Sequence, residues 1–346
     1  MTTAFLIATI IKVLVLFHMV PIMVSLLTLA ERKVSAWIQF RYGPNRVGPW
    51  GLFQPIADGL KFFFKEELVP EGANPFLFRI APALAAGPAM MTVAVIPFTF
   101  PILIDGQPFS MAIADINIGV LFFIAMSGLG VYGILLGGWG SNNKWSLLGG
   151  LRASAQMISY ELSMMMSVIT VVMLTGTMNL GEIFSFQGEH TWILFFFPVG
   201  TIAFVIFLIA AFAETNRLPF DLAECETELV GGFHTEYSSM KFALFFMGEY
   251  SAMFTMSCLL ATFFLGGPTF FGLIESIDSL WLRALIGFLV FAAKVGLFLF
   301  FYIWVRWTLP RFRWDQLMHL GWKILLPISI LNLMATGILI ATGVLS

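Results

Sequence analysis

The residues with the most distinctive chemistry in this chain lie in one polar stretch, residues 213–239, between two strongly hydrophobic segments. Its sequence is AETNRLPFDLAECETELVGGFHTEYSS, and its six carboxylates are Glu214, Asp221, Glu224, Glu226, Glu228 and Glu236. Carboxylates held close together repel one another, so they bind and release protons as a coupled set. Six carboxylates contribute nothing to anchoring a chain in a bilayer. The stretch therefore predicts a protein that handles protons beside a membrane.

Three ionisable residues lie inside hydrophobic segments, where charge is costly. Glu161 comes nine residues after Arg152, about 13 Å along a helix; Glu249 comes eight residues after Lys241 at nearly the same depth, and Lys294 lies closer to the middle of its segment. Such groups cost several kcal/mol unless paired or hydrated, so they should face the interior of a helical bundle. Lys294 can pair with only one of Glu161 and Glu249, so the other carboxylate stays unpaired. An unpaired buried acid can bind and release a proton, which favours a proton relay over the simpler interpretation of a structural Glu–Lys ion pair.

The elements that must position these residues are membrane helices. The chain is 59% hydrophobic and 11% charged, with a mean hydropathy of +0.91, and so little charge cannot solvate a soluble protein of 346 residues. Each apolar segment is about 20 residues or longer, which suits a membrane helix and exceeds a barrel strand. We expect an all-α integral membrane protein, one membrane domain over residues 1–346, with eight transmembrane helices near 4–30, 83–104, 117–136, 153–175, 192–213, 241–266, 283–307 and 323–345.

The distribution of cations predicts how these helices are oriented. Four connections, residues 31–82, 137–152, 214–240 and 308–322, together with the helix ends beside them, hold nearly all the lysines and arginines. The opposite side has essentially Arg283 alone. By the positive-inside rule, these connections are inner loops and both termini lie on the outer, periplasmic side.

The first inner loop contains a segment that should lie on the membrane surface. Residues 54–67 (QPIADGLKFFFKEE) follow the turn-forming sequence RYGPNRVGP and read as an amphipathic helix. Its apolar side carries Ile56, Leu60, Phe63 and Phe64, and its polar side carries Asp58, Lys61 and Lys65. Such a helix lies in the interface. It is either a lipid-headgroup anchor or the lined entrance for an amphiphile that arrives from the bilayer.

The last inner loop should contact a partner. Arg306, Arg311 and Arg313 alternate there with Trp307, Phe312 and Trp314. In a soluble protein this pattern would suggest nucleic acid, but the flanking membrane helices favour docking to a partner subunit or to lipid phosphates.

Motifs for cofactors are missing from the sequence. Cys225 and Cys258 form no CxxC pair, the four histidines have no metal-ligand spacing, and neither GxGxxG nor GxxxxGKS occurs. We therefore expect no metal, no redox centre, no nucleotide and no catalysis by the isolated chain.

Four long motifs together resemble one family. They are AERKVSAWIQFRYGPNRVGPWGLFQPIADGLK, GWGSNNKWSLLGGLRASAQMISYE, FAETNRLPFDLAECETELVGGFHTEYSSMKFALFFMGEY and PRFRWDQLMHLGWK. In this order, over essentially the whole chain, they look like the H subunit (subunit 1) of complex I, the proton-pumping NADH:quinone oxidoreductase. The resemblance implies eight membrane helices, with helices 2–6 similar to an antiporter-like half-channel. It also implies quinone as substrate, a bacterial inner membrane, and partner subunits that hold NADH, FMN and iron–sulfur clusters.

The resemblance also assigns roles to residues of this chain. It implies a quinone entrance and tunnel lined by Glu31, Arg32, Arg41, Arg46, Asp58, Lys61 and Phe233. It implies proton coupling through Glu161, Glu214, Arg217, Asp221, Glu224, Glu226, Glu228, Glu249 and Lys294. Its partners would be the quinone-module subunits of the peripheral arm and the neighbouring membrane-arm subunits, besides membrane lipids. We expect Arg306, Arg311 and Arg313 to dock the partner subunits.

Three other interpretations stay open from the sequence. The equivalent subunit of a membrane-bound hydrogenase would lack quinone, but the GPNRVGPWGLFQPIADGLK and PRFRWDQLM motifs favour the quinone version. A stand-alone proton or cation transporter fits poorly with inner loops rich in arginine and aromatic residues. A passive membrane anchor gains nothing from the buried acids Glu161 and Glu249.

Overall fold

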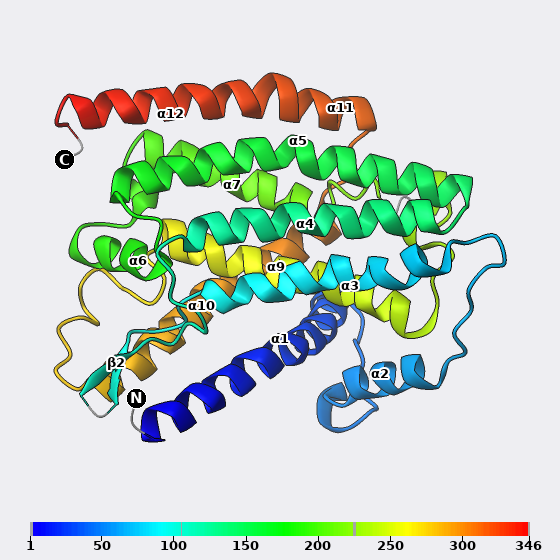
Figure 1. Ribbon diagram of the computed structural model, residues 1–346, viewed down its shortest axis with the longest axis horizontal. Coiled ribbons are helices and arrows are strands. Elements are labelled where there is room, and N and C mark those ends of the chain that lie inside the picture. Colours follow the sequence, from blue (N-terminus) through cyan, green and yellow to red (C-terminus); the bar gives the residue numbers. More distant parts are fainter. Residues whose placement is uncertain (1–2, 105, 224–225, 345–346) are drawn as a thin grey trace.

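The computed structural model describes residues 3–104, 106–223 and 226–344, and within these ranges the chain is a bundle of long helices (Figure 1). Seven of the described helical segments are long and apolar enough to cross a membrane. They are α1 (Thr3–Ile38), α3 (Pro75–Thr92), α4 (Gly119–Gly140), α5 (Lys144–Thr175), α9 (Ser239–Phe264), α10 (Leu280–Thr308) and the continuous segment Trp314–Ala341. That last segment joins α11 (Trp314–His319), the π-helical turn η5 (Leu320–Leu325) and α12 (Leu326–Ala341).

The predicted segment 192–213 is shorter than expected. Its helix is α7 (Val199–Glu214), which has 16 residues. Pro198 stands at the N-cap position, and the residues before it form the single turn η3 (Ile193–Phe195). Proline lacks a backbone N–H and restricts the residue before it, so the helix starts here rather than at residue 192.

The second predicted membrane segment, 83–104, is displaced toward the N-terminus. Asn74 caps α3 by accepting hydrogen bonds from the backbone N–H groups of Phe76 and Leu77, and the helix ends at Thr92, followed by η2 (Val93–Val95). Pro97 and Pro101 prevent helix in the residues beyond. The chain instead forms the antiparallel hairpin of β1 (Ile102–Ile104) and β2 (Gln107–Phe109), a small departure from the all-α prediction.

Three other boundaries also differ from the sequence prediction. Helix α1 continues eight residues beyond residue 30, so Glu31 and Arg32 lie on a membrane helix and not in a loop. Helix α5 starts at Lys144, where Asn143 accepts a hydrogen bond from the Trp145 N–H. The final helical segment begins at Trp314, inside the predicted loop 308–322. In each case the helix extends past the apolar part of its sequence and includes polar residues at its end.

The short elements include the predicted surface helix. The predicted amphipathic helix is present as α2 (Gln54–Phe64), and its apolar side chains Ile56, Leu60, Phe63 and Phe64 are exposed in this chain. Its place at the membrane surface stays a prediction. The other short elements are η1 (Pro49–Gly51), α6 (Leu180–Glu189), α8 (Glu226–Leu229) and η4 (Gly232–His234). Helix α2 lies beside the end of α1 that is opposite the chain's N-terminus (Figure 1).

The helices of the bundle pack closely, and the acidic stretch lies toward one end of it. Helices α3 and α4 approach so closely that a Cβ on Gly133 would collide with the backbone of Ala85. The C-terminal half of α9 is buried, with Leu259, Leu260 and Phe263 fully enclosed. Both described chain ends lie at one end of the bundle, whereas α2 and η4 lie toward the other (Figure 1). The second of these ends carries the acidic stretch of the sequence.

Candidate functional site

A pocket of about 440 Å³ lies between α1, α2, α9 and the last turn of α10. One part of its wall is polar and includes Glu31, Arg32, Asp58 and Tyr250. The rest is apolar, with residues such as Phe62, Phe242, Phe246, Met247 and Trp307. An ion pair closes the wall between α1 and α2, because Arg32 Nη1 is 2.7 Å from Asp58 Oδ2. Such a mixed wall suits a ligand with a polar head and an apolar tail.

The structure brings only some of the predicted entrance residues to this pocket. Glu31, Arg32 and Asp58 line it. Arg41 donates a hydrogen bond to Gln39 Oε1 at 2.6 Å, and Arg46 and Lys61 are exposed. Phe233 is buried and lines a different cavity, described below.

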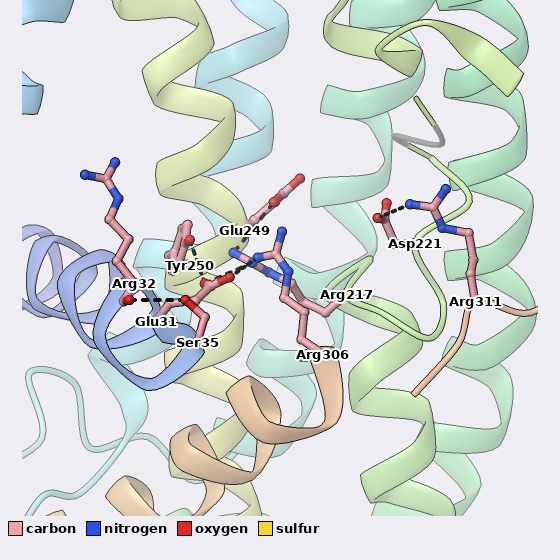
Figure 2. Close-up of polar contacts among 9 residues, drawn as sticks. All are labelled: Glu31, Arg32, Ser35, Arg217, Asp221, Glu249, Tyr250, Arg306 and Arg311. Atoms are coloured by element: carbon pink, nitrogen blue, oxygen red, sulfur yellow. Dashed lines mark hydrogen bonds and ion pairs between the residues drawn. The ribbon is translucent and has the colours of Figure 1, made fainter. Parts of the chain in front are cut away.

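The pocket is joined to the interior by a buried ionic network centred on Glu31 (Figure 2). Its carboxylate accepts hydrogen bonds from Tyr250 Oη at 2.7 Å and Arg217 Nη1 at 3.4 Å, and a third from Arg306. On its other side, Arg217 Nη2 lies 3.8 Å from Glu249 Oε2. The Arg217 side chain is 4% exposed and that of Glu31 is 8% exposed. Four segments, α1, the acidic stretch, α9 and α10, therefore meet through one set of charges.

Arg217 holds its charge firmly in this network. Burial works against the charged form, but Tyr250, Glu31 and Glu249 outweigh that effect and raise the pKa of Arg217 above its ordinary range. The guanidinium carbon also lies 4.1 Å from the centre of the Tyr250 ring, in a cation–π contact. A buried charge of this kind stays in place only while its carboxylate partners stay ionised.

A second, smaller cavity begins on the far side of Glu249. It has a volume of about 70 Å³ and is lined by Glu249, Glu214, Ser127 and Thr92 among other residues. Ser127 Oγ donates a 2.7 Å hydrogen bond to Glu214 Oε1. A buried water needs only about 10–15 Å³ of such space and a few polar partners, so this cavity can hold a short chain of water.

Glu161 continues this line of acids on the other side of α4. A Cβ placed on Gly128 would be 3.2 Å from Glu161 Oε1, so the missing side chain of this glycine makes room for the carboxylate. Glu161 is also close enough to Glu214 for their charges to interact. Glu249 and Glu214 therefore share one cavity, and Glu161 lies close to Glu214.

The remaining carboxylates of residues 213–239 are not one cluster. Asp221 pairs with Arg311 at 2.8 Å, and Glu228, whose side chain is 56% exposed, pairs with Arg152 at 2.7 Å. Glu236 accepts a hydrogen bond from Asn143 at 2.6 Å. Glu224 and Cys225 lie outside the described residues, as does the side chain of Glu226. Each described acid therefore has its own partner.

The predicted docking arginines have different roles. Arg306 contacts Glu31 and Arg311 contacts Asp221, so both tie the last loop to this chain's own polar residues. Arg313 pairs with Asp315 at 3.2 Å, and its side chain is 78% exposed. Of the three, Arg313 has the most exposed side chain, and the docking role stays a prediction.

Lys294 lies apart from the acids. Its ammonium group donates hydrogen bonds to the backbone oxygens of Leu265, Gly267 and Thr269, at 2.6, 2.9 and 2.6 Å. It also lies 4.4 Å from the centre of the Trp192 ring. Within the described residues it forms no ion pair with Glu161 or Glu249, so the interpretation of a structural Glu–Lys pair between these helices is wrong.

Sequence reasoning missed Tyr250 and Ser127. Tyr250 follows Glu249 directly in an apolar helix, and that adjacency was an available signal. Ser127 carries no signal, because a serine among SGLGVYG reads as an ordinary small residue of a membrane helix. Among the described residues, no three His, Cys, Asp or Glu side chains are grouped as metal ligands.

Comparison with known proteins shows similarity along nearly the whole chain. Residues 11–337 match the family described as NADH dehydrogenase. The chain is 49% identical over 340 residues to the H subunit of NADH-quinone oxidoreductase from Flavobacterium psychrophilum, and the aligned part covers 98% of each chain. It is 51% identical over 314 residues to the H 1 subunit of the enzyme from Cytophaga hutchinsonii, covering 90% of each, and 50% identical over 326 residues to the H 1 subunit from Geobacter metallireducens, covering 94% of each.

Proposed function

The chain belongs to the NADH dehydrogenase family as the H subunit of NADH-quinone oxidoreductase, the membrane-bound complex I, and on this premise we propose that it admits quinone and couples quinone reduction to proton translocation. The observation that carries the proposal is the position of Glu31. This residue lines the 440 Å³ pocket and also pairs with Arg217, whose other partner, Glu249, lines the acid cavity. One carboxylate therefore joins a ligand pocket to a proton path.

The pocket fits quinone because it has two kinds of wall. The apolar residues of α2 and α9 suit the tail, and the exposed apolar side of α2 suits a position at the bilayer surface, from which a lipid-soluble substrate arrives. Glu31, Arg32, Asp58 and Tyr250 provide polar contacts for the ring oxygens. Arg41, Arg46 and Lys61 would form the exposed approach, and Phe233 lines the neighbouring acid cavity.

The coupling step is electrostatic. Two electrons from a partner subunit place negative charge on the quinone, and this charge competes with Glu31 for Arg217 and Arg306. At about 4 Å and an effective dielectric constant of about 20, two unit charges interact by about 4 kcal/mol, enough to change the partners of a buried arginine. When Arg217 is drawn toward the pocket, Glu249 loses its cation and binds a proton more readily.

The proton path then follows the acids through the bundle. Glu249 shares the small cavity with Glu214, and Glu161 lies beside Glu214 across α4. Water in the cavity would carry protons between the first two carboxylates. Asp221 and Glu228, which pair with Arg311 and Arg152, would add negative charge near the inner surface. The coupling role of Glu224 and Glu226 stays a prediction. We leave Lys294 out of this path because its ammonium group is held by backbone oxygens at the opposite end of α9.

The proposed arrangement in the membrane has eight crossings. Helix α7 is the additional one, because its apolar residues are buried among longer helices even though it has 16 residues. An even number of crossings puts both termini on one side, which the cation distribution places outside a bacterial inner membrane. The second to sixth crossings would form the antiporter-like half-channel within a single domain. Partner subunits would bind NADH, FMN and the iron–sulfur clusters.

The identity of the relatives disfavours the other interpretations of the sequence. Relatives about 50% identical over nearly their full length are named as subunits of a quinone oxidoreductase, not of a hydrogenase or a stand-alone transporter. The buried Glu31–Arg217–Glu249 network also argues against a passive anchor. Apolar residues of the same volume are often at least as stabilising as buried ion pairs, so an anchor would not need these charges.

The test uses the intact complex in proteoliposomes with Glu249→Gln or Glu214→Gln. We expect quinone reduction and proton uptake to fall at least tenfold, while electron transfer from NADH to a water-soluble acceptor stays unchanged. Glu189→Gln is the matched control, because this carboxylate is exposed at the end of α6 and has no part in the proposed path. Full proton pumping in both Glu249→Gln and Glu214→Gln would refute the proton path.

A further inference from the structure

A second large groove, of about 560 Å³, lies along the half of α1 that is nearer the chain's N-terminus, and none of its lining residues lines the quinone pocket. One wall is a stripe of α1 that includes Ile11, Val15 and Met19, and the facing wall is a stripe of α10 that includes Trp281, Leu285 and Phe288. The spacings of three, four and eight residues keep each stripe on one helix face. The groove is therefore a gap between two long helices, with a floor formed by the segment around the β1–β2 hairpin.

The groove has one charged residue in its lining, Lys12. Its ammonium group donates a 3.1 Å hydrogen bond to Ser110 O and lies 4.6 Å from the centre of the Phe109 ring. Ser110 O is its one hydrogen-bond acceptor within the described part of the chain. Asp115 acts on it through space, but this exposed carboxylate accepts a hydrogen bond from Asn179 at 2.9 Å. Lys12 thus has donors left for a ligand.

The order of the groups along the groove matches a phospholipid. On α1 the lining of the groove runs from Ala8 to Met19, about 16 Å. Lys12 lies in the outer half of this length, about 10 Å from Met19 along the helix, and Trp281 is at the start of α10. Half of a bilayer's hydrocarbon core is about 15 Å thick, so the distance from Lys12 to Met19 lies within one leaflet. Tryptophan favours the level of the headgroups. A cation at headgroup level above an apolar groove is complementary to a phosphate that carries an acyl chain.

We propose that this groove binds an anionic glycerophospholipid, with its phosphate on Lys12 and one acyl chain between α1 and α10. The bound chain would fill the gap between the two helices and support α1 against α10. The same helix α1 carries Glu31 and Arg32 at its other end, 19 and 20 residues from Lys12. The lipid would therefore help to hold the quinone pocket from the opposite leaflet.

The experiment places a photoreactive benzoylphenylalanine at Met111, a residue that lines the groove. The intact complex is reconstituted in nanodiscs with equal amounts of phosphatidylglycerol and phosphatidylcholine, irradiated, and the lipid adducts are identified by mass spectrometry. We expect phosphatidylglycerol adducts to exceed phosphatidylcholine adducts about fivefold, the factor that corresponds to one lysine near a membrane surface. Lys12→Arg should keep this ratio, and Lys12→Gln should abolish it.

The same photoreactive residue at Leu14 is the control, because this exposed side chain of α1 does not line the groove. It should give both lipids equally. Assembly is checked by electron transfer from NADH to a soluble acceptor, which none of these changes touches. Three results would overturn the proposal: equal adducts at Met111, a ratio that Lys12→Gln leaves unchanged, or adducts with a neighbouring subunit or quinone in place of lipid.

Discussion

Glu31 and Arg217 are 186 residues apart in the sequence, yet their side chains meet at 3.4 Å in the interior of the protein. Glu31 belongs to α1 and faces the quinone pocket, whereas Arg217 belongs to the acidic stretch and faces Glu249. Their contact is thus the boundary between the proposed substrate site and the proposed proton path. A change of charge on one side of it cannot leave the other side unaffected, because both carboxylates share one guanidinium.

Glu31→Gln should disrupt both sides of this boundary. The substitution removes the charge that balances Arg217 and Arg306, and leaving a buried charge without its partner costs about 3–5 kcal/mol. We expect a lower apparent melting temperature of the complex and loss of quinone reduction, with electron transfer to a soluble acceptor retained. Glu189→Gln, which changes an exposed carboxylate at the end of α6, is the matched control and should change neither quantity. Normal quinone turnover in Glu31→Gln would contradict the proposed coupling.

Filling the acid cavity should separate proton transfer from substrate binding. Ala252 lines the 70 Å³ cavity between Glu249 and Glu214, and Ala252→Leu would displace the water there at a packing cost of about 1–3 kcal/mol. We expect proton uptake and quinone turnover to fall together, with the KM for quinone unchanged. Ala252→Ser leaves room and adds a polar group, so it should stay close to wild type. A raised KM with normal pumping would show that the cavity serves the substrate instead.

Tyr237 should make the protein sensitive to alkaline pH. Burial raises the pKa of Tyr237 above its ordinary range, and its ring stacks on Phe78 with centroids 4.0 Å apart. In the unfolded chain tyrosine ionises near pH 10, whereas in the folded protein Tyr237 stays neutral to higher pH. Its contribution to stability is therefore complete below about pH 10 and is lost as the pH rises toward its folded pKa, by up to about 1.4 kcal/mol per pH unit.

Tyr237→Phe removes this sensitivity and keeps the stacking. Melting temperatures of wild type and variant, measured from pH 8 to pH 11, should differ by a constant amount up to about pH 10. Above that value the wild type should lose stability faster than the variant. Parallel curves over the whole range would show that Tyr237 ionises as easily in the folded protein as in the unfolded chain.

Lys294→Gln should weaken the loop after α9 without blocking proton transfer. The ammonium group satisfies three backbone oxygens, and a hydrogen bond to a charged group contributes about 1.5–3 kcal/mol. We expect a clear drop in melting temperature and faster hydrogen exchange in residues 265–269, while the number of protons pumped per quinone stays the same. Lys294→Arg should restore part of the stability. Fewer protons pumped per quinone at unchanged stability would show that Lys294 takes part in proton transfer.

Much of the architecture follows from the sequence because a membrane imposes local rules. Apolar segments must be helical to satisfy their backbone groups, so most of the helices were predictable from composition alone. The helix α2 was predictable because Phe63 and Phe64 fall on one face of it and Asp58 and Lys61 on another. Helix ends were less predictable because they depend on individual residues: Asn143 starts α5 nine residues early, and Pro198 shortens α7.

The partners of the charged residues were decided by the tertiary structure alone. The sequence predicts that Glu161 and Glu249 lie inside the bundle and that Glu214 lies in an inner loop. It does not predict that Glu214 is buried and shares a cavity with Glu249, or that Gly128 makes room for Glu161. Arg306 looked like a surface docking residue, and it contacts Glu31 across 275 residues of sequence. The physical reason is that burial depends on the residue's own helix, whereas an ion pair depends on how two distant helices pack, and side-chain periodicity carries no information about the second helix.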